Sequence, residues 1–428
     1  MEIWMIVVCF SIFFVTFLIG MPIWLSLTLT AISFALFAGM PVDNVPIKFY
    51  SSLDSYLLLA VPFFLLGGNI MARCGPAKAL FEAMDAAVGH LPGGLPFAVV
   101  CTCMVFAAIT GSTLATLVSV GTIAVPPMVA MGYPKRFCLG LMCVSSTLGQ
   151  IIPPSVYMIL YGSYVQVSAA KLFLGGMLPG LFVGLLIAAV VLIKTVNGGY
   201  EKQREPMPTA ERWRKFAFGL PAAFMPILVL GGIYTGIFTP TEAAAIACVY
   251  SIAVSYFIYR GLTWAKFVEA LRGGVTTTSM IFLIVAASIL LAGPLTYAEI
   301  PQNLTNALID MGVGKYSMIF LSIGLFLFLG LFLDPLPILY LTIPILNFPL
   351  RAFNIDMIHF CVITIICMQI AQVTPPFGVS LYTTSQMWDE PIQNVVKSAM
   401  PFLLAIACAL PIIVFFPSLS TWLPSLFM

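Results

Sequence analysis

The sequence Gln150-Ile151-Ile152-Pro153-Pro154-Ser155 lies inside a long apolar run, and Gln372-Val373-Thr374-Pro375-Pro376-Phe377 lies inside another. The two stretches are separated by 222 residues, from Gln150 to Gln372, and the same offset relates Gly111-Ser112-Thr113 to Leu333-Asp334-Pro335 without a gap. Because proline removes a backbone donor and clashes with the preceding helical turn, each proline pair must break a helix. Two helices broken at equivalent places in two halves of an apolar chain are typical of a secondary transporter's binding site.

Composition limits the class of protein. The chain has 428 residues, of which 61% are hydrophobic and 8% are charged, so we expect a polytopic protein surrounded by a lipid bilayer. The net charge of +2 and the lack of a basic tract argue against a nucleic-acid partner. The ten cysteines fit no metal spacing, and no ATP-binding loop or hydrolase motif is present. The sequence therefore does not predict an enzyme.

Two apolar runs, 95–131 and 316–350, are too long for one membrane span and too short for two, and each is interrupted midway. We expect each to form a re-entrant helical hairpin that enters and leaves the membrane on one side. The proline pairs place broken helices in 137–163 and 357–384. Three scaffold helices precede each hairpin and one final helix follows each broken helix.

The only polar stretch, 196–216, divides the chain into two repeats, 1–195 and 217–428. Each repeat has five full crossings, an odd number, so we expect the repeats to be inverted relative to each other. With the 196–216 linker in the cytoplasm, 14 of the 18 basic residues lie on the cytoplasmic side, which agrees with the positive-inside rule. This topology places both termini in the periplasm. The remaining four basic residues are external: Lys48, Lys171, Lys315 and Arg351.

Each hairpin tip, together with the break of its own repeat, is a candidate ion site. Hydroxyls and the carbonyls freed by proline are hard oxygen ligands suited to Na⁺, and the start of a hairpin's second arm is suited to a carboxylate. A capped kink without a ligand is the structural alternative. The predicted Na⁺ ligands are Gly111, Ser112, Thr113, Gly149 and Pro153 in the first repeat, and Asp334, Thr374, Pro375 and Gly378 in the second.

We expect the organic substrate to contact polar side chains at the same tips and breaks. The predicted substrate-binding residues are Thr110, Ser112, Thr116, Ser145, Gln150, Ser155, Gln369, Gln372 and Ser380.

Two acidic residues have competing interpretations. Asp334 is the only carboxylate in the middle of an apolar segment, so it is either an ion ligand or, with Pro335 after it, a helix N-cap. Glu242 follows Thr239-Pro240-Thr241, and this order predicts a capping box with a structural role.

These motifs resemble the large membrane subunit of the TRAP (tripartite ATP-independent periplasmic) transporters. The residues that carry the resemblance run through most of the chain: 52–64, Gly111-Ser112-Thr113-Leu114-Ala115-Thr116, Ile151-Ile152-Pro153-Pro154-Ser155, 236–245, Asp334-Pro335-Leu336-Pro337 and Thr374-Pro375-Pro376-Phe377-Gly378. One departure is the first tip, Thr110-Gly111-Ser112-Thr113, where the family often has Ser-Gly-Ser-Ser or Ser-Gly-Ser-Ala.

The resemblance implies a Na⁺-coupled symporter of the bacterial inner membrane. It implies import of an organic acid, such as a C4-dicarboxylate, sialic acid or another sugar acid, delivered by a periplasmic substrate-binding protein. It also implies a small four-helix membrane subunit and an elevator-type mechanism of the ion-transporter superfamily. The alternative is a Na⁺/dicarboxylate symporter of similar architecture that needs no binding protein.

Overall fold

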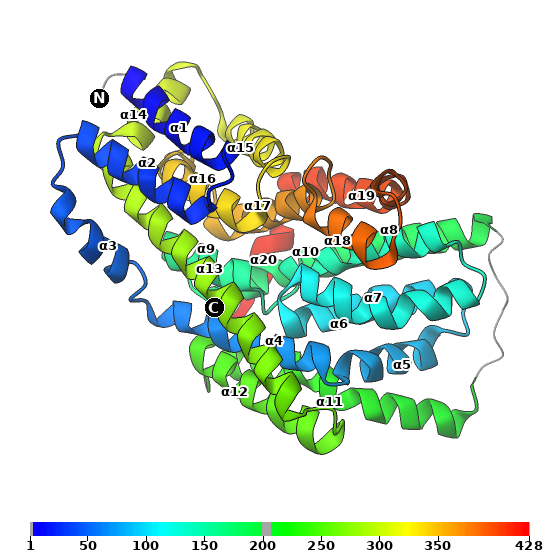
Figure 1. The fold of residues 1–428 in the computed structure, drawn as a ribbon. Coiled ribbons are helices and arrows are strands. Elements are labelled where there is room, and N and C mark those ends of the chain that lie inside the picture. Colours follow the sequence, from blue (N-terminus) through cyan, green and yellow to red (C-terminus); the bar gives the residue numbers. More distant parts are fainter. Residues whose placement is uncertain (1–2, 199–206, 428) are drawn as a thin grey trace.

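The computed structural model describes residues 3–198 and 207–427, and all the secondary structure in this part of the chain is helical (Figure 1). Up to the polar linker, the longer helices are α1 (Ile3–Leu18), α2 (Ile23–Phe37), α3 (Val45–Ser51), α4 (Ala60–Arg73), α5 (Pro76–Val88), α6 (Gly94–Thr110), α7 (Thr113–Ala130), α8 (Lys135–Ser145), α9 (Val156–Val165) and α10 (Ala169–Gly198). Short 3₁₀ turns occupy Val42–Asn44 (η1), Tyr56–Leu59 (η2) and Ser146–Gln150 (η3).

The second part of the described chain is also helical. Its helices are α11 (Thr209–Tyr234), α12 (Pro240–Ala253), α13 (Trp264–Tyr297), α14 (Ile300–Asp310), α15 (Lys315–Gly330), α16 (Pro335–Ala352), α17 (Met357–Gln372), α18 (Val379–Trp388), α19 (Ile392–Phe415) and α20 (Ser418–Phe427). A π-helical turn, Val254–Ile258 (η4), follows α12.

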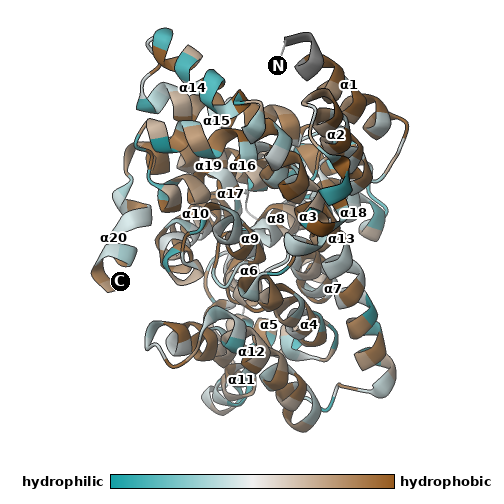
Figure 2. Ribbon diagram, turned by 90° about the vertical axis from the view of Figure 1, so that its left-hand side faces the viewer, coloured by the Kyte–Doolittle hydropathy of each residue, from teal (hydrophilic) through white to brown (hydrophobic). Residues whose placement is uncertain are grey.

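Apolar helices dominate the molecule, and most of the ribbon is brown when it is coloured by hydropathy (Figure 2). Within the described ranges, seven helices are long and apolar enough to cross a membrane, and further apolar helices of 10–17 residues accompany them. The chain is therefore a multi-pass membrane protein, as its composition predicts.

Both Gln-x-x-Pro-Pro stretches interrupt a helix. The first separates α8 and η3 from α9, and the second separates α17 from α18. Each of the two long apolar runs forms a pair of helices, α6 with α7 and α15 with α16. The first hairpin lies between α5 on one side and α8 with α10 on the other (Figure 1). Packing crosses the two halves: α16 lies against α9, and α7 lies against α18.

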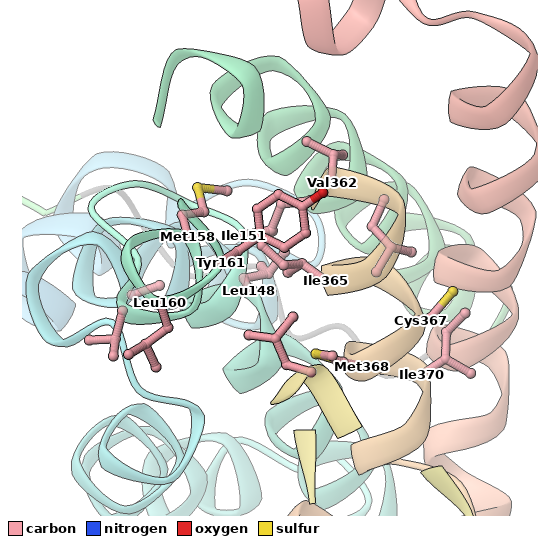
Figure 3. Packing of buried hydrophobic residues seen from close by; sticks show 14 of the residues in the cluster. Leu148, Ile151, Met158, Leu160, Tyr161, Val362, Ile365, Cys367, Met368 and Ile370 are labelled. Carbon is pink, nitrogen blue, oxygen red and sulfur yellow. The ribbon is translucent and has the colours of Figure 1, made fainter. Parts of the chain in front are cut away.

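The broken helices share one apolar core. Leu148 and Ile151 of the first break, and Tyr161 of α9, face Val362 and Ile365 of α17, and all five side chains are essentially inaccessible to solvent (Figure 3). Lipid chains are as apolar as these residues, so close packing rather than escape from water stabilises this contact. The core thus fixes the first break against the helix that leads into the second.

Several elements differ from the sequence-based expectation. Helices α5 and α14 lie between the third span and the hairpin in each half, where we expected no helix. Each has a proline within its first two positions, Pro76 or Pro301, and each follows a residue with a left-handed backbone. They are amphipathic rather than apolar, so a search for membrane spans does not find them.

The chain ends also differ from the simple span pattern. The single final helix expected after the second broken helix is two helices, because α19 ends at Phe415 and Pro417 precedes a separate helix, α20, which packs against α10. Helices α10 and α11 extend into the predicted linker 196–216, as far as Gly198 and from Thr209. Residues 199–206 of that linker lie outside the described ranges.

Candidate functional site

The tip of the first hairpin is a tight, hydroxyl-rich turn. Gly111 ends α6 with φ +58°, a left-handed conformation that favours glycine, and its N–H donates to Ala107. Ser112 is the N-cap of α7, and its hydroxyl accepts the Ala115 N–H at 3.4 Å, as the capping interpretation predicts. Thr116 donates to the Ser112 carbonyl at 2.9 Å and pairs with the Thr110 hydroxyl at 3.0 Å. Local bonds therefore define the tip.

The structure places this tip directly against the first break. A Cβ added to Gly149 would lie 3.3 Å from the carbonyl carbon and oxygen of Ser112, and one added to Gly111 would lie 3.4 Å from the Pro154 carbonyl oxygen. Both glycines therefore lie close to backbone atoms of the other segment, and a side chain at position 149 would require the tip to shift by a few tenths of an ångström. The first tip and the first break therefore lie against each other, as the sequence predicts.

The first break is buried and only partly hydrogen-bonded. Ser155 donates its hydroxyl across the proline pair to the Gln150 carbonyl, so it does not cap α9. The hydroxyl of Ser145 and both side-chain polar atoms of Gln150 are buried without a protein partner, as is the hydroxyl of Thr113 at the tip. Pro153 is buried beside them. Buried polar atoms without partners cost free energy unless a ligand, ion or water satisfies them.

The second break shares the glutamine and the proline pair of the first but is more open. Thr374 donates its hydroxyl to the Ile370 carbonyl at 2.7 Å, and the Gly378 N–H donates to the Thr374 carbonyl at 3.1 Å. Pro375, unlike Pro153, is exposed. The side-chain oxygens of Gln372 and Ser380 are buried without a protein partner. The two breaks are therefore similar in chemistry and different in accessibility.

Asp334 occupies the N-cap position of α16, but its side chain caps no backbone N–H. The residue therefore stands where the capping interpretation puts it, but the side-chain hydrogen bond that a cap would make is missing. The carboxylate is exposed and lies close enough to Tyr157 of the first break for the two side chains to interact electrostatically. Asp334 therefore leaves its carboxylate oxygens free of a capping hydrogen bond.

One hydrogen bond joins the two breaks. The Gln369 side-chain nitrogen donates to the Thr147 carbonyl at 2.9 Å, and both residues are fully buried. These two residues are 222 positions apart, the offset that relates the two Gln-x-x-Pro-Pro stretches. This bond therefore connects equivalent positions of the two stretches. The side-chain oxygen of Gln369 keeps no protein partner.

The predicted site residues thus gather at two hairpin tips and two breaks. Their donor atoms are carbonyl, hydroxyl and amide oxygens with one carboxylate, a set that suits a hard cation such as Na⁺. No group of three or more His, Cys, Asp or Glu side chains occurs within residues 3–198 and 207–427, so the described chain offers no transition-metal site.

Sequence reasoning missed four contributors to this region. Tyr157 lies near Asp334, the Thr147 carbonyl accepts from Gln369, and Tyr340 of α16 donates to the Leu160 carbonyl of α9 at 3.1 Å. A Cβ on Gly68 of α4 would lie 2.8 Å from the Cα of Thr110, so the tip also touches the preceding helices. Only Thr147 carried a signal, the 222-residue offset to Gln369.

A cavity of about 820 Å³ lies behind the first break, between α6, α10 and α11. Its lining includes Ile152 and Pro153 of the break, Leu181 and Leu230, and it contains no charged side chain. This surface suits hydrocarbon and not an organic acid, so we place the candidate site on the hydroxyl-bearing side of the break.

Comparison with known proteins decides the family. Residues 10–419 match the model for the tripartite ATP-independent periplasmic transporter, DctM component. The chain belongs to the TRAP transporter large permease family. The permease is 37% identical over 400 residues to the C4-dicarboxylate TRAP transporter large permease protein DctM of Pseudomonas aeruginosa, covering 92% of each chain. It is 31% identical to the sialic acid TRAP transporter large permease protein SiaM of Vibrio cholerae, covering 96% of each.

Two further comparisons add to this assignment. The permease is 31% identical to the isethionate TRAP transporter permease protein DctMQ of Oleidesulfovibrio alaskensis, covering 96% of the permease and 65% of that longer protein. Its fold is similar to that of the Alcanivorax borkumensis YdaH transporter, with a TM-score of 0.63 at 12% identity over 88% and 87% of the two chains. The relatives are named as permeases, which indicates a transporter rather than an enzyme.

Proposed function

We propose that this permease is the large membrane subunit of a Na⁺-coupled symporter that imports an organic acid across the bacterial inner membrane. The observation that carries the proposal is the meeting of the first hairpin tip with the first break, Ser112 against Gly149, beside buried oxygens that have no protein partner. Dehydrated Na⁺ needs several such oxygens at once, and unwound backbone at membrane depth supplies them.

The halves are proposed to be inverted repeats. Equivalent contacts support this: α2 packs on α13 as α12 packs on α4, α9 packs on α16 as α18 packs on α7, and Thr147 bonds Gln369. A two-fold axis in the membrane plane produces such reciprocal pairs and brings both breaks to the midplane. The 14-to-4 distribution of basic residues agrees with the inversion.

An elevator motion is proposed, in which the hairpins and broken helices move as a block against the scaffold helices. The hairpins and breaks are joined to one another through the Gln369 bond, the Gly149 contact and the shared core of Figure 3. The contact of Gly68 in α4 with the first tip is then an interface between scaffold and block, and it must change during transport.

The substrate is proposed to be a carboxylate, such as a C4-dicarboxylate or a sugar acid, which are the substrate classes named for two of the relatives. No Lys or Arg lies at the tips or breaks, so a carboxylate would depend on other positive groups. Helices α7, α9, α16 and α18 all begin at a tip or a break, and their free N–H groups and bound Na⁺ would supply them.

The proposed partners are a small four-helix membrane subunit and a periplasmic substrate-binding protein. The family is described as tripartite, and the matched DctMQ protein is longer than this chain. A binding protein would deliver the acid to the periplasmic face, where the 14-to-4 distribution of basic residues places both termini.

Uptake by proteoliposomes tests this proposal. Vesicles holding the permease and its small subunit are given a labelled C4-dicarboxylate or sialic acid, with and without the binding protein and an inward Na⁺ gradient. We expect uptake only when both are present. Uptake without a binding protein would favour the independent dicarboxylate symporter, and uptake indifferent to Na⁺ would remove the ion from the mechanism.

Variants then locate the ion. Ser112→Ala and Thr374→Ala are expected to raise the Na⁺ concentration for half-maximal uptake, because each removes a hydroxyl oxygen at a tip or a break. The matched control is Glu242→Ala, which removes a capping-box carboxylate at the start of α12, outside both breaks, and is expected to lower the yield of protein without changing the Na⁺ response. An unchanged Na⁺ response in Ser112→Ala would reduce the tip to a helix cap.

A further inference from the structure

The two half-helices that leave the breaks, α9 and α18, end in the same way. Each has ten residues, and each is closed by a residue with positive φ, Gln166 at +60° and Asp389 at +48°. In both, the last helical residue has a carbonyl that accepts a hydrogen bond from a basic side chain. Arg351 Nη2 donates to the Val165 carbonyl at 2.9 Å, and Lys135 Nζ donates to the Trp388 carbonyl at 2.7 Å.

Each of these cations comes from the opposite half of the chain. Arg351 lies in the last turn of α16 and bonds α9 of the first half, whereas Lys135 is the first residue of α8 and bonds α18 of the second half. The free carbonyls at a helix C-terminus carry partial negative charge, so a cation there is favourable in each case. Each half of the chain therefore supplies one basic side chain that bonds the C-terminus of a short helix in the other half.

Both cations are held in place by a second group. Arg351 Nε donates to the Asn347 side-chain oxygen at 3.2 Å, one turn earlier on α16. Lys135 lies 3.6 Å from the Glu390 carboxylate, which is largely buried and also accepts from Asn394 at 2.7 Å. A side chain that is oriented in this way has less conformational freedom to lose when it bonds the carbonyl.

The charge asymmetry of the chain makes Arg351 notable. It is one of only four basic residues assigned to the external side, where the positive-inside rule disfavours them. Membrane topology therefore does not explain an arginine at position 351. The hydrogen bond from Arg351 to the C-terminal carbonyl of α9 explains it.

We propose that Arg351 and Lys135 are positioning residues that clamp α9 and α18 to the opposite repeat. A ten-residue helix is a rigid rod about 15 Å long, so fixing its C-terminus also fixes its N-terminus. The N-terminus of α9 lies at Ser155, against the first tip, and that of α18 lies at Gly378 in the second break. The clamps keep both N-termini in register with the proposed ion sites, and this role in transport depends on the proposed Na⁺-coupled function.

Hydrogen exchange of the purified, complete permease tests the clamps without requiring transport. Arg351→Gln is expected to speed amide exchange in 156–165 at least about threefold and to leave 379–388 unchanged, and Lys135→Gln is expected to do the reverse. Arg351→Lys, which keeps one charged donor, is expected to restore most of the protection. The controls are Lys315→Gln and Lys397→Gln, since neither lysine makes a hydrogen bond or ion pair within the described residues.

Na⁺ dependence of uptake gives the second readout. Arg351→Gln and Lys135→Gln are expected to raise the half-saturating Na⁺ concentration at least about threefold, with the maximal rate within about twofold of the wild type. Wild-type uptake that ignores Na⁺ would refute the proposed function but leave the exchange test valid. Exchange that is unchanged in both glutamine variants would overturn the clamps whatever the uptake shows. If Arg351→Gln does not fold, Asn347→Ala is expected to speed exchange in 156–165, and its failure to do so would overturn the proposal equally.

Discussion

The hydrogen bond between Gln369 and the Thr147 carbonyl links the two breaks, and Gln369→Met tests its importance. Methionine has a similar length and volume, so it removes the donor without opening a large cavity. Both residues are fully buried, and the bond is 2.9 Å long. A buried carbonyl that loses its donor costs about 1–3 kcal/mol. The same substitution also removes the Gln369 oxygen, which has no protein partner and whose burial is itself unfavourable.

These two effects separate when Na⁺ is varied. Without Na⁺, the lost bond and the relieved oxygen partly cancel, so we expect a small loss of stability, below about 1 kcal/mol. With Na⁺, a ligand that binds only the folded state stabilises the wild type by about 2.7 kcal/mol at 100 times its Kd. If the break geometry set by Gln369 supports ion binding, the variant gains less from Na⁺ than the wild type does.

Thermal unfolding in detergent measures this difference, in NaCl and in choline chloride at equal ionic strength. A change of 1 kcal/mol shifts Tm by about 2–4 °C in a chain of 150–250 residues, and by less in a longer one. The matched control is Gln386→Met, an exposed glutamine on α18 for which the wild-type response to Na⁺ is expected. Equal Na⁺ stabilisation in Gln369→Met and wild type would refute the reasoning that this bond supports the ion sites.

Three further predictions concern the surroundings of the site. Gly68→Ala places a Cβ 2.8 Å from the Cα of Thr110 in the first hairpin, so we expect it to destabilise the described conformation by about 1–3 kcal/mol. The first tip should then differ in its accessibility to protease, and an unchanged digestion pattern would contradict this prediction. Thr239→Ala removes the N-cap that bonds Glu242 and is expected to cost about 0.5–2 kcal/mol in thermal unfolding, with Na⁺ dependence of uptake preserved. The hydrogen bond from Asn394 lowers the pKa of Glu390. The ionised Glu390 carboxylate therefore contributes its full stabilisation above pH about 4.5, and this contribution declines as the pH falls through the lower folded-state pKa. Glu390→Gln should make Tm less dependent on pH in this acidic range.

The sequence predicted the elements that depend on local chemistry. The proline pairs at 153–154 and 375–376 interrupt helices, as their missing donors require. Ser112 caps the second hairpin arm, and Thr239 forms the predicted capping box. These outcomes follow because a cap or a break is decided within about one helical turn, by residues that are adjacent in the sequence.

The remaining features depend on contacts between distant residues, which no local rule encodes. The approach of Gly149 to the Ser112 backbone depends on the packing of two separate segments, and glycine is common in membrane helices whether or not another backbone approaches it. The free side chain of Asp334 is another example, since Asp before proline predicts a cap that the structure does not contain. Helices α5 and α14 escaped prediction because amphipathic helices lack a continuous apolar run.

The difference between the two breaks follows from what surrounds equivalent backbones. The first break packs against the hairpin tip at Gly111 and against α17, and its Gln150 side chain is fully buried. The second break presents Pro375 and Phe377, 56% exposed, on an open face. Related ion sites need only equivalent carbonyls and hydroxyls, which both breaks retain. A single substrate cleft needs unequal walls, and the exposure of the second break provides them, so we expect Phe377→Ala to change substrate affinity while Na⁺ affinity stays within about twofold of the wild type.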